Sequence, residues 1–165
     1  MNGPVRIVTD ASVWIDLHDG GLVAQMFGMD FELIAPDVVI AEIEEPSGSE
    51  LVARGLASKE LSAVQIVEAQ QLRSQNTSLS MPDAFACVLA RASGTILLTG
   101  DRRLRAVAEH LGIRVHGTLW LVHRMVRARV LSPQWAVKAL ELMRAAGSRF
   151  PQDAYQRLLR RLSGD

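Results

Sequence analysis

VRIVTD, at residues 5–10, is the stretch that decides the fold of this chain. Its first part is rich in β-branched and apolar side chains and predicts a short buried strand, and an aspartate follows that strand directly. The same arrangement returns at residues 95–101, where the apolar run TILLT precedes Gly100 and Asp101. Helical patterns lie between such strands along the chain. This alternation predicts a mostly parallel sheet with helices on both faces, a three-layer α/β/α fold.

The remaining elements follow from periodicity, caps and breakers. Strands are expected at residues 5–9, 31–35, 64–67, 95–99 and 113–115. Helices are expected at residues 11–18, 22–28, 37–45, 50–57, 102–111 and from a Ser80 cap to about residue 93. Beyond residue 117 the pattern is helical only, with segments at 118–130, 133–146 and 152–162. We therefore expect one domain over residues 1–130 and a helical C-terminal extension over residues 131–165, packed on that domain.

The composition is that of a globular protein, with 48% hydrophobic and 22% charged residues. No apolar run reaches the roughly 18 residues that a membrane helix needs, and the first residues lack the apolar stretch of a signal peptide. Cys87 is the single cysteine and cannot form an internal disulfide. These features predict a cytoplasmic protein.

Charge is sorted along the chain although the net charge is zero. Residues 1–50 carry ten acids and one base, whereas residues 101–165 carry thirteen bases and five acids. This sorting suits a protein that holds an anionic polymer on its basic part and cations in an acidic pocket. An equally good explanation is that folding intermixes the two halves and spreads the charge over the surface.

Four acidic residues are candidates for a metal site. Asp10 and Asp101 follow strands, and the carboxyl ends of parallel strands meet at one edge of a sheet, where functional residues gather. Glu42 and Asp83 are expected on helices that can lean over the same edge. Four carboxylates without a basic partner repel one another. A divalent cation that prefers oxygen ligands, Mg²⁺ or Mn²⁺, removes that repulsion.

Each acid also has a plainer explanation. Asp101 fits a helix N-cap, and Asp83 fits the third residue of a capping box that begins at Ser80. Glu42 lies in a run of glutamates, for which a solvated helix face is the default. Asp10 is the hardest to explain in this way, because an acid directly after a buried strand is out of place unless it is used.

Four segments of the chain resemble the PIN-domain family. They are IVTDASVWI at residues 7–15, PDVVIAEI at 36–43, MPDAFA at 81–86 and LLTGDRRL at 97–104. Their order, spacing and expected local structure are similar to the four-acid pattern of the family. Ser12 stands where the family has a small hydroxyl or amide beside the first acid, and Thr99 where it has a hydroxyl before the last one.

The resemblance implies a Mg²⁺- or Mn²⁺-dependent ribonuclease, usually dimeric, in which four acids are the catalytic residues and metal ligands: Asp10, Glu42, Asp83 and Asp101. The helical tail is similar to that of a bacterial and archaeal PIN subgroup. Many members of the wider family are toxins of the VapC type, so a small antitoxin protein is an implied partner. Trp120 departs from the pattern, because a smaller residue is expected after Gly-Thr-Leu.

Hydrolysis of RNA by water at such a site would leave a 5′-phosphate and a 3′-hydroxyl. Three arginines close behind Asp101 are candidate contacts to the RNA backbone, although a solvated helix face explains any one of them equally well: Arg102, Arg103 and Arg105. Two other functions stay open. One is a PIN-like RNA- or protein-binding module without catalysis. The other is an aspartate-dependent phosphatase, which is disfavoured because neither lysine, Lys59 or Lys138, has a fitting context.

Overall fold

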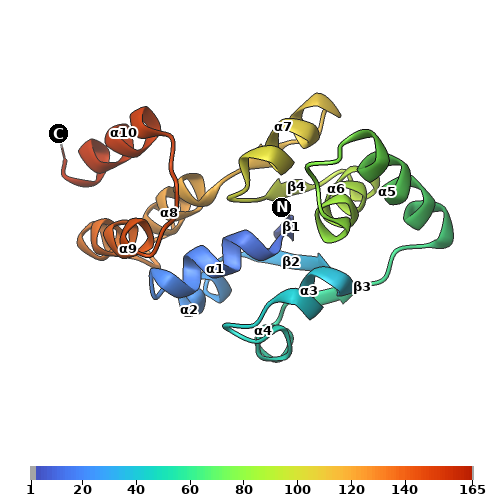
Figure 1. Cartoon of the computed structure of the whole chain (residues 1–165). Helices are drawn as coiled ribbons and strands as arrows, with labels where there is room; N and C mark the ends of the chain where they lie inside the picture. The colour runs from blue at the N-terminus through green and yellow to red at the C-terminus, as the bar shows by residue number, and fades with distance from the viewer. Residues whose placement is uncertain (1–2, 165) are drawn as a thin grey trace.

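The computed structural model describes residues 3–164 and contains a sheet of five strands. The strands are β1 (Val5–Thr9), β2 (Phe31–Pro36), β3 (Ala57–Lys59), β4 (Ile96–Leu98) and β5 (Val115–His116). Their order in the sheet is β3-β2-β1-β4-β5, and every neighbouring pair is parallel (Figure 1). The predicted α/β fold with a parallel sheet is confirmed.

Ten helices accompany this sheet over the described residues. They are α1 (Ala11–Asp19), α2 (Val23–Phe27), α3 (Asp37–Glu42), α4 (Gly48–Arg54), α5 (Ala63–Gln75), α6 (Met81–Ser93), α7 (Arg102–His110), α8 (Thr118–Arg127), α9 (Pro133–Ala145) and α10 (Gln152–Leu162). Figure 1 shows α5 and α6 on one side of the sheet and α1 and α2 on the other. The expected three layers are therefore present.

Strand β1 lies in the middle of the sheet and fixes where the acids emerge. Val8 pairs with Ile34 of β2 on one side and with Leu97 of β4 on the other. The second half of β1 is fully buried, as an apolar central strand of a parallel sheet should be. Because β1 and β4 are adjacent and parallel, the residues that follow them, Asp10 and Asp101, leave the sheet at the same edge.

Helix α1 is fixed on β1 by Trp14, whose side chain is fully buried. The indole Nε1 donates a hydrogen bond of 2.9 Å to the hydroxyl of Thr9, the last residue of β1. The same ring stacks on Phe27 at a centroid distance of 5.5 Å. A buried indole with its N–H satisfied contributes apolar contact without leaving an unpaired donor. The direction in which α1 leaves the sheet is therefore set at its first turns.

The strand expected at residues 64–67 is wrong, because these residues belong to α5. Ser62 begins that helix with a capping box, in which its hydroxyl accepts from the backbone N–H of Gln65 and its own N–H reaches the Gln65 side chain. Val64 and Val67 are 69% and 50% exposed, so this apolar run is not a buried strand. The third strand is β3, which the sequence pattern did not indicate and which pairs with the end of β2.

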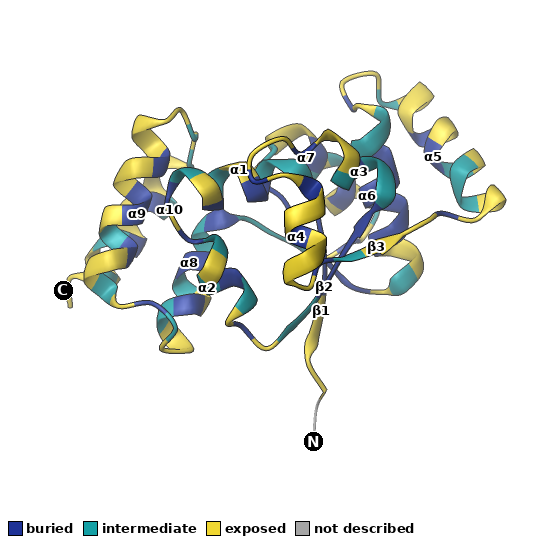
Figure 2. Cartoon of the chain, turned by 90° about the horizontal axis from the view of Figure 1, so that it is seen from below, coloured by how far each residue is buried: buried dark blue, intermediate teal, exposed yellow. Residues whose placement is uncertain are grey.

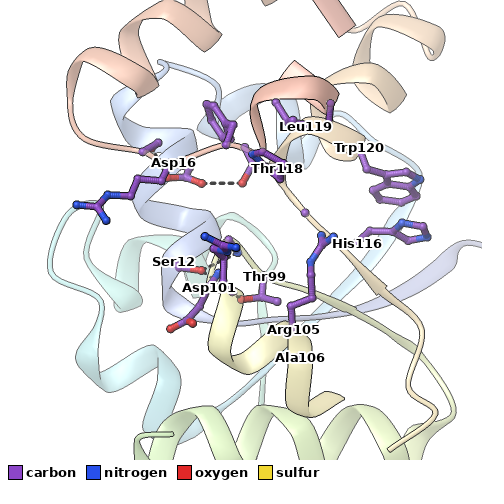
Figure 3. Close-up of a pocket in the computed structure, with 18 of the residues that line it drawn as sticks. Ser12, Asp16, Thr99, Asp101, Arg105, Ala106, His116, Thr118, Leu119 and Trp120 are labelled. Carbon is purple, nitrogen blue, oxygen red and sulfur yellow. Dashed lines mark hydrogen bonds between the residues drawn. The ribbon is translucent and has the colours of Figure 1, made fainter. Parts of the chain in front are cut away.

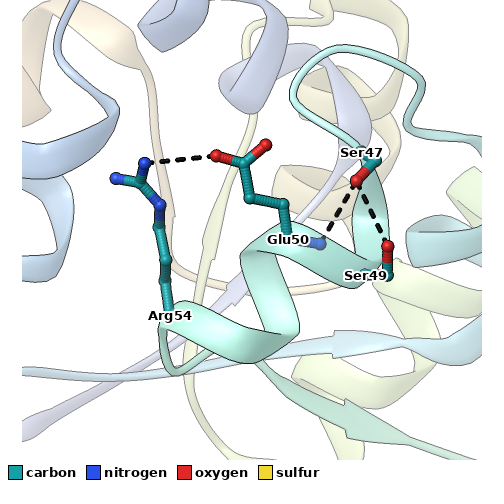
Figure 4. A network of polar contacts seen from close by, with 4 residues as sticks. All are labelled: Ser47, Ser49, Glu50 and Arg54. Carbon is teal, nitrogen blue, oxygen red and sulfur yellow. Dashed lines mark hydrogen bonds and ion pairs between the residues drawn. The ribbon is translucent and has the colours of Figure 1, made fainter.

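Helix α3 ends at Glu42, three residues earlier than expected, and α4 begins at Gly48. The backbone of Gly48 lies against α3 so closely that a Cβ would stand 2.2 Å from the carbonyl oxygen of Ile40. Only glycine permits this approach, and the chain turns there. Ser47 then caps α4 by accepting from the N–H of Glu50, and Glu50 pairs with Arg54 at 3.1 Å (Figure 4).

The C-terminal helices pack on the rest of the chain. Helix α9 contacts α1, and α10 contacts both α8 and α9. Tyr155 and Leu158 of α10 are buried, and Figure 2 shows the buried faces of these helices turned toward each other. The boundary expected at residue 130 stays a prediction. Over the described residues, no helix has the length and apolar character needed to cross a membrane.

Candidate metal centre

Asp10 lies directly after β1 as the N-cap of α1, and it is only 2% exposed. Its carboxylate accepts hydrogen bonds from the Ser12 hydroxyl at 2.7–2.8 Å and from the backbone N–H of Val13 at 3.2 Å. The hydroxyl of Thr99, at the end of β4, also donates to it. A buried carboxylate is thus held by two hydroxyls and one amide rather than by a base.

Ser12 and Thr99 join the ends of β1 and β4 at this point. Each hydroxyl donates to Asp10 and accepts from the turn after β4, Ser12 from the N–H of Gly100 at 2.8 Å and Thr99 from that of Asp101 at 2.9 Å. The donor and acceptor of both hydroxyls are therefore assigned. The two residues that sequence reasoning singled out as supporting the acids lie together beside Asp10.

Asp101 and Asp83 both cap helices, as their plainer explanation predicts. Asp101 accepts from the N–H groups of Arg103 at 2.8 Å and Leu104 at 3.3 Å through one oxygen, Oδ1. Asp83 accepts from the N–H of Ser80 at 3.0 Å through Oδ2, within a capping box. In the described part of the chain, each keeps its second carboxylate oxygen out of these bonds. Capping therefore leaves one oxygen of each acid for another role.

Glu42, Asp83 and Asp10 are electrostatic neighbours. Burial, with the nearby charge of Asp83 as a second cause, raises the pKa of Glu42 above its usual range. The pKa of Asp10 is raised to about 7, chiefly by burial and to a smaller extent by the charge of Asp83, against the lowering effect of its hydrogen bonds from Thr99, Ser12 and Val13. Asp83 therefore lies within electrostatic reach of both Glu42 and Asp10. Thr99 joins Asp10 to the turn that carries Asp101.

No base neutralises this cluster among the ion pairs of the described residues, which all lie elsewhere: Arg6–Glu32, His18–Glu45, Arg54–Glu50 and Arg91–Glu68. Within residues 3–164 no three Asp, Glu, His or Cys side chains stand close enough to surround one ion. The side chains thus form an open group of carboxylates rather than a closed coordination shell. An uncompensated buried carboxylate with further free carboxylate oxygens nearby fits a hard divalent cation.

Asp16 is a site residue that sequence reasoning missed. Its half-buried carboxylate accepts from Thr118 of α8 at 2.7 Å and from Ser148, between α9 and α10, at 2.6 Å (Figure 3). Burial raises the pKa of Asp16 above its usual range, and the two hydroxyls partly oppose that shift. A Cβ added at Gly100 would lie 3.0 Å from its Oδ2, so Asp16 borders the turn after β4. In the sequence it is one of several polar residues of α1, and no motif singles it out.

The three arginines of α7 are not equivalent. Arg102 and Arg105 line a cavity that also contains Asp101, whereas Arg103 does not face it. Arg102 and Arg103 are exposed and Arg105 is half-buried. The helix period explains this, because residues three apart share a face and their neighbour does not. The sequence could not distinguish the three before the orientation of α7 was known.

A five-stranded parallel sheet with acids after β1 and β4 and on two flanking helices defines an α/β protein of the PIN type. The family model DUF3368, described as a PIN domain, matches residues 6–164, and the chain belongs to this family. The matched region includes α9 and α10. PIN domains are generally nucleases and usually bind Mg²⁺ through acidic residues.

The fold is also similar to that of a solved structure, the crystal structure of PAE2754 from Pyrobaculum aerophilum. The TM-score is 0.56 and the sequence identity is 16%, over 75% of this chain and 98% of that one. This likeness supports the fold alone. No curated protein sequence gives a significant match to the chain.

The raised pKa of Asp10 predicts how the metal-free protein responds to pH. Its folded-state pKa of about 7 lies above the unfolded value of roughly 3.9. Between these values the folded state keeps a proton that the unfolded state has lost, so stability should fall as pH rises from about 4 to about 7 and then level off. Asp10→Asn cannot titrate and should be more stable than wild type at pH 7.5, by ~1–4 kcal/mol, since one pKa unit is about 1.4 kcal/mol.

Chemical denaturation in EDTA at pH 5 and pH 7.5 measures this difference. Asp153→Asn, which alters an exposed acid of α10, is the matched control and should leave the pH dependence unchanged. Equal pH dependence in Asp10→Asn and wild type would contradict the assignment.

Proposed function

We propose that this protein is a Mg²⁺- or Mn²⁺-dependent endoribonuclease. The observation that carries the proposal is the buried carboxylate of Asp10, which has no basic partner in the described chain. Asp83 is its acidic neighbour, and Thr99 joins it to the turn that carries Asp101. Membership of a family that is generally nucleolytic supports it. The chemistry that a bound divalent cation supplies is a lowered pKa of water and compensation of charge on the phosphoryl oxygens.

Asp10 and Asp101 would hold the cation, with Glu42 and Asp83 as direct or water-mediated ligands. Ser12 and Thr99 orient the Asp10 carboxylate through the hydroxyl bonds described above, which fixes the ligand before any cation arrives. Asp101 and Asp83 are fixed in the same way by the helix starts that they cap. Hydrolysis with water as the nucleophile would give a 5′-phosphate and a 3′-hydroxyl.

The RNA backbone would lie along the basic second half of the chain. None of the ion pairs of the described residues involves an arginine beyond Arg91, so the arginines of α7, α8 and α10 keep their charge unpaired within that part of the chain. Arginines gathered on one part of a surface attract phosphates without regard to sequence. Arg102 and Arg105 follow Asp101 within four positions and line the cavity beside the acidic edge.

A PIN-like binding module without catalysis is the second candidate. The observation that favours it is the open arrangement of the acids, two of which already serve as helix caps, with no three ligating side chains closed around one point in residues 3–164. An aspartate-dependent phosphatase gains no support, because Lys59 lies in the edge strand β3 and Lys138 lies on α9.

The toxin role and the partners are part of the same proposal. An antitoxin would inhibit by placing an Arg or Lys side chain among the four acids, because that contact compensates the charge that the free protein leaves unpaired. Self-association would involve the tail. On α9 the apolar side chains of Trp135 and Leu142 are 66% and 42% exposed, and their spacing of two turns puts them on one face.

Replacement of the acids at the strand ends tests catalysis. Asp10→Asn and Asp101→Asn should each lower Mn²⁺-dependent cleavage of single-stranded RNA by more than about 100-fold, since even residues that merely orient ligands are worth roughly 10–100-fold. Mn²⁺ should raise the melting temperature of wild type by binding linkage and that of the variants much less. Cleavage assays and thermal melts with and without Mn²⁺ measure both effects. Variants that cut at the wild-type rate would remove these residues from the site.

Salt dependence tests the basic surface. Binding of single-stranded RNA to the cleavage-deficient Asp10→Asn protein should weaken steeply with salt, with a log–log slope of about −0.7 for each phosphate contact. Arg102→Ala should make that slope shallower by roughly 0.7 if Arg102 is such a contact. Fluorescence anisotropy at four or more salt concentrations gives the slope. An affinity independent of salt would show that the charge sorting has no role in binding.

Recovery of the protein from its own host tests the partners. The proposal predicts a stoichiometric small companion in the native complex and, for the isolated chain, a dimer of the 18.1 kDa polypeptide. Light scattering with mass spectrometry measures both. Recovery without a companion, together with harmless overexpression, would contradict the toxin role, and an isolated monomer would contradict the dimer. Neither result would bear on the nuclease assignment.

A further inference from the structure

A cavity of about 490 Å³ opens beside the acidic edge of the sheet. One wall is the edge itself, with Ser12, Thr99 and Asp101, and a second wall is α7. The segment from His116 to Trp120 forms the third wall, and the segment between α9 and α10 forms the fourth. This volume lies within the range of roughly 300–1,000 Å³ that is usual for small-ligand sites. Of the four acids only Asp101 lines this cavity, and the proposed nuclease function gives no role to its third and fourth walls.

Three arginines line this cavity, Arg102, Arg105 and Arg149, of which Arg105 is half-buried and the other two are exposed. The Arg105 guanidinium packs against the turn between β5 and α8, where a Cβ added at Gly117 would lie 2.6 Å from one Nη atom. Figure 3 shows its side chain rising from α7 between Thr99 and His116. The missing side chain at Gly117 leaves this space to the guanidinium. Arg105 has no ion-pair partner among the described residues, so its charge is free for a ligand.

His116 and Trp120 provide a flat aromatic part. Their rings stack at a centroid distance of 4.2 Å and an interplanar angle of 7°, and the guanidinium of Arg124 stands 5.7 Å from the centroid of Trp120. Burial lowers the pKa of His116, and the charges of Arg105, Arg114 and Arg124 lower it further. The imidazole is therefore an uncharged ring at neutral pH. Phe31 continues the stack, with its ring centroid 6.4 Å from that of Trp120, so the three rings together offer planar apolar surface within a positively charged surrounding.

The C-terminal extension closes the cavity. Ser148 is held by Asp16, which binds Thr118 at the same time, so this segment is tied to α1 and to the start of α8. Phe150 follows in the cavity wall and stacks on Tyr155 of α10 at 5.7 Å. Asp16 acts here as a positioning residue. The wall contributed by the extension is fixed by specific contacts and is not a loose loop end.

We propose that this cavity binds one nucleotide of the RNA, next to the phosphate that is cut, with its phosphate at Arg105 and its base against the His116–Trp120 pair. The inference rests on the proposed nuclease function and names the part of the substrate that the cavity takes. An inorganic anion would leave the aromatic wall unused, and a purely apolar ligand would leave Arg105 buried against it without a partner. Three acids, Asp16, Asp101 and Glu109, line the cavity beside the three arginines, so the lining as a whole does not favour ligands of high negative charge. A single phosphate on a planar base meets all of these conditions.

The three tryptophans of the chain allow a direct test. Trp14 is buried in the core, Trp135 is exposed on α9 and Trp120 lines the cavity. Indole N–H signals of ¹⁵N-labelled protein in EDTA should be followed by NMR during titration with uridine 5′-monophosphate, adenosine 5′-monophosphate and inorganic phosphate. Both nucleotides should shift the Trp120 signal in a saturable way and leave the other two in place. Phosphate should need at least ~5-fold higher concentration for the same shift.

Arg105→Gln should weaken nucleotide binding by ~5-fold or more while the melting temperature confirms that the variant is folded. Arg73→Gln, which removes an exposed arginine of α5 outside the cavity, is the matched control and should bind as wild type does. Three results would overturn the proposal: an unmoved Trp120 signal, a phosphate titration that matches the nucleotide titration, or equal binding by Arg105→Gln and wild type.

An RNA cleavage assay of the wild-type protein, set beside the nucleotide titration, separates this inference from the nuclease function. Nucleotide binding without RNA cleavage by the wild type would refute the nuclease proposal and leave a nucleotide site at the cavity. RNA cleavage with an unmoved Trp120 signal would refute the nucleotide site and leave the nuclease.

Discussion

A carboxylate buried at the end of the central strand is the constraint on which the rest of this structure depends. Burial of the Asp10 carboxylate costs free energy of solvation, and hydrogen bonds from two hydroxyls and one amide offset that cost instead of an opposite charge. Ser12 follows β1 and Thr99 follows β4, so both can donate to Asp10 only if the ends of these two strands are side by side. The hydrogen bonds of this one carboxylate therefore depend on the order of strands in the sheet. Trp14 supports this arrangement by fixing α1 on β1, since the first turn of α1 carries Ser12.

Much of this arrangement can be read from the sequence, and the reason is geometric. Asp10 and Asp101 follow strands whose apolar patterns are strong, and two parallel neighbouring strands bring the residues after them together whatever the rest of the chain does. Helix starts were also predictable, because Ser80 and Asp101 cap them through bonds between residues close in sequence. Glu42 and Asp83 were expected on helices that lean over the same edge, and the family resemblance implied that all four acids are catalytic residues and metal ligands.

Other parts could not be read in this way. A run of four residues such as Val64–Val67 suits a strand or one side of a helix, and the Ser62 cap decided between them. The edge strand β3 has only three residues, too few for a pattern. Asp16 and the cavity depend on contacts between residues more than a hundred positions apart, which periodicity within one element does not contain. Arg102, Arg103 and Arg105 differ only through the rotation of α7 relative to the sheet.

The double hydrogen bond of Asp16 has a consequence for the way the chain can be divided. A boundary at residue 130 would separate Ser148 from the carboxylate that holds it and would remove Phe150 from the wall that it completes. The last helices therefore cannot be deleted or exchanged without changing the part of the chain on which they pack. Substitutions in these helices are constrained wherever they face α1, α8 or one another, and the contact of Ser148 needs an acceptor at the position of Asp16.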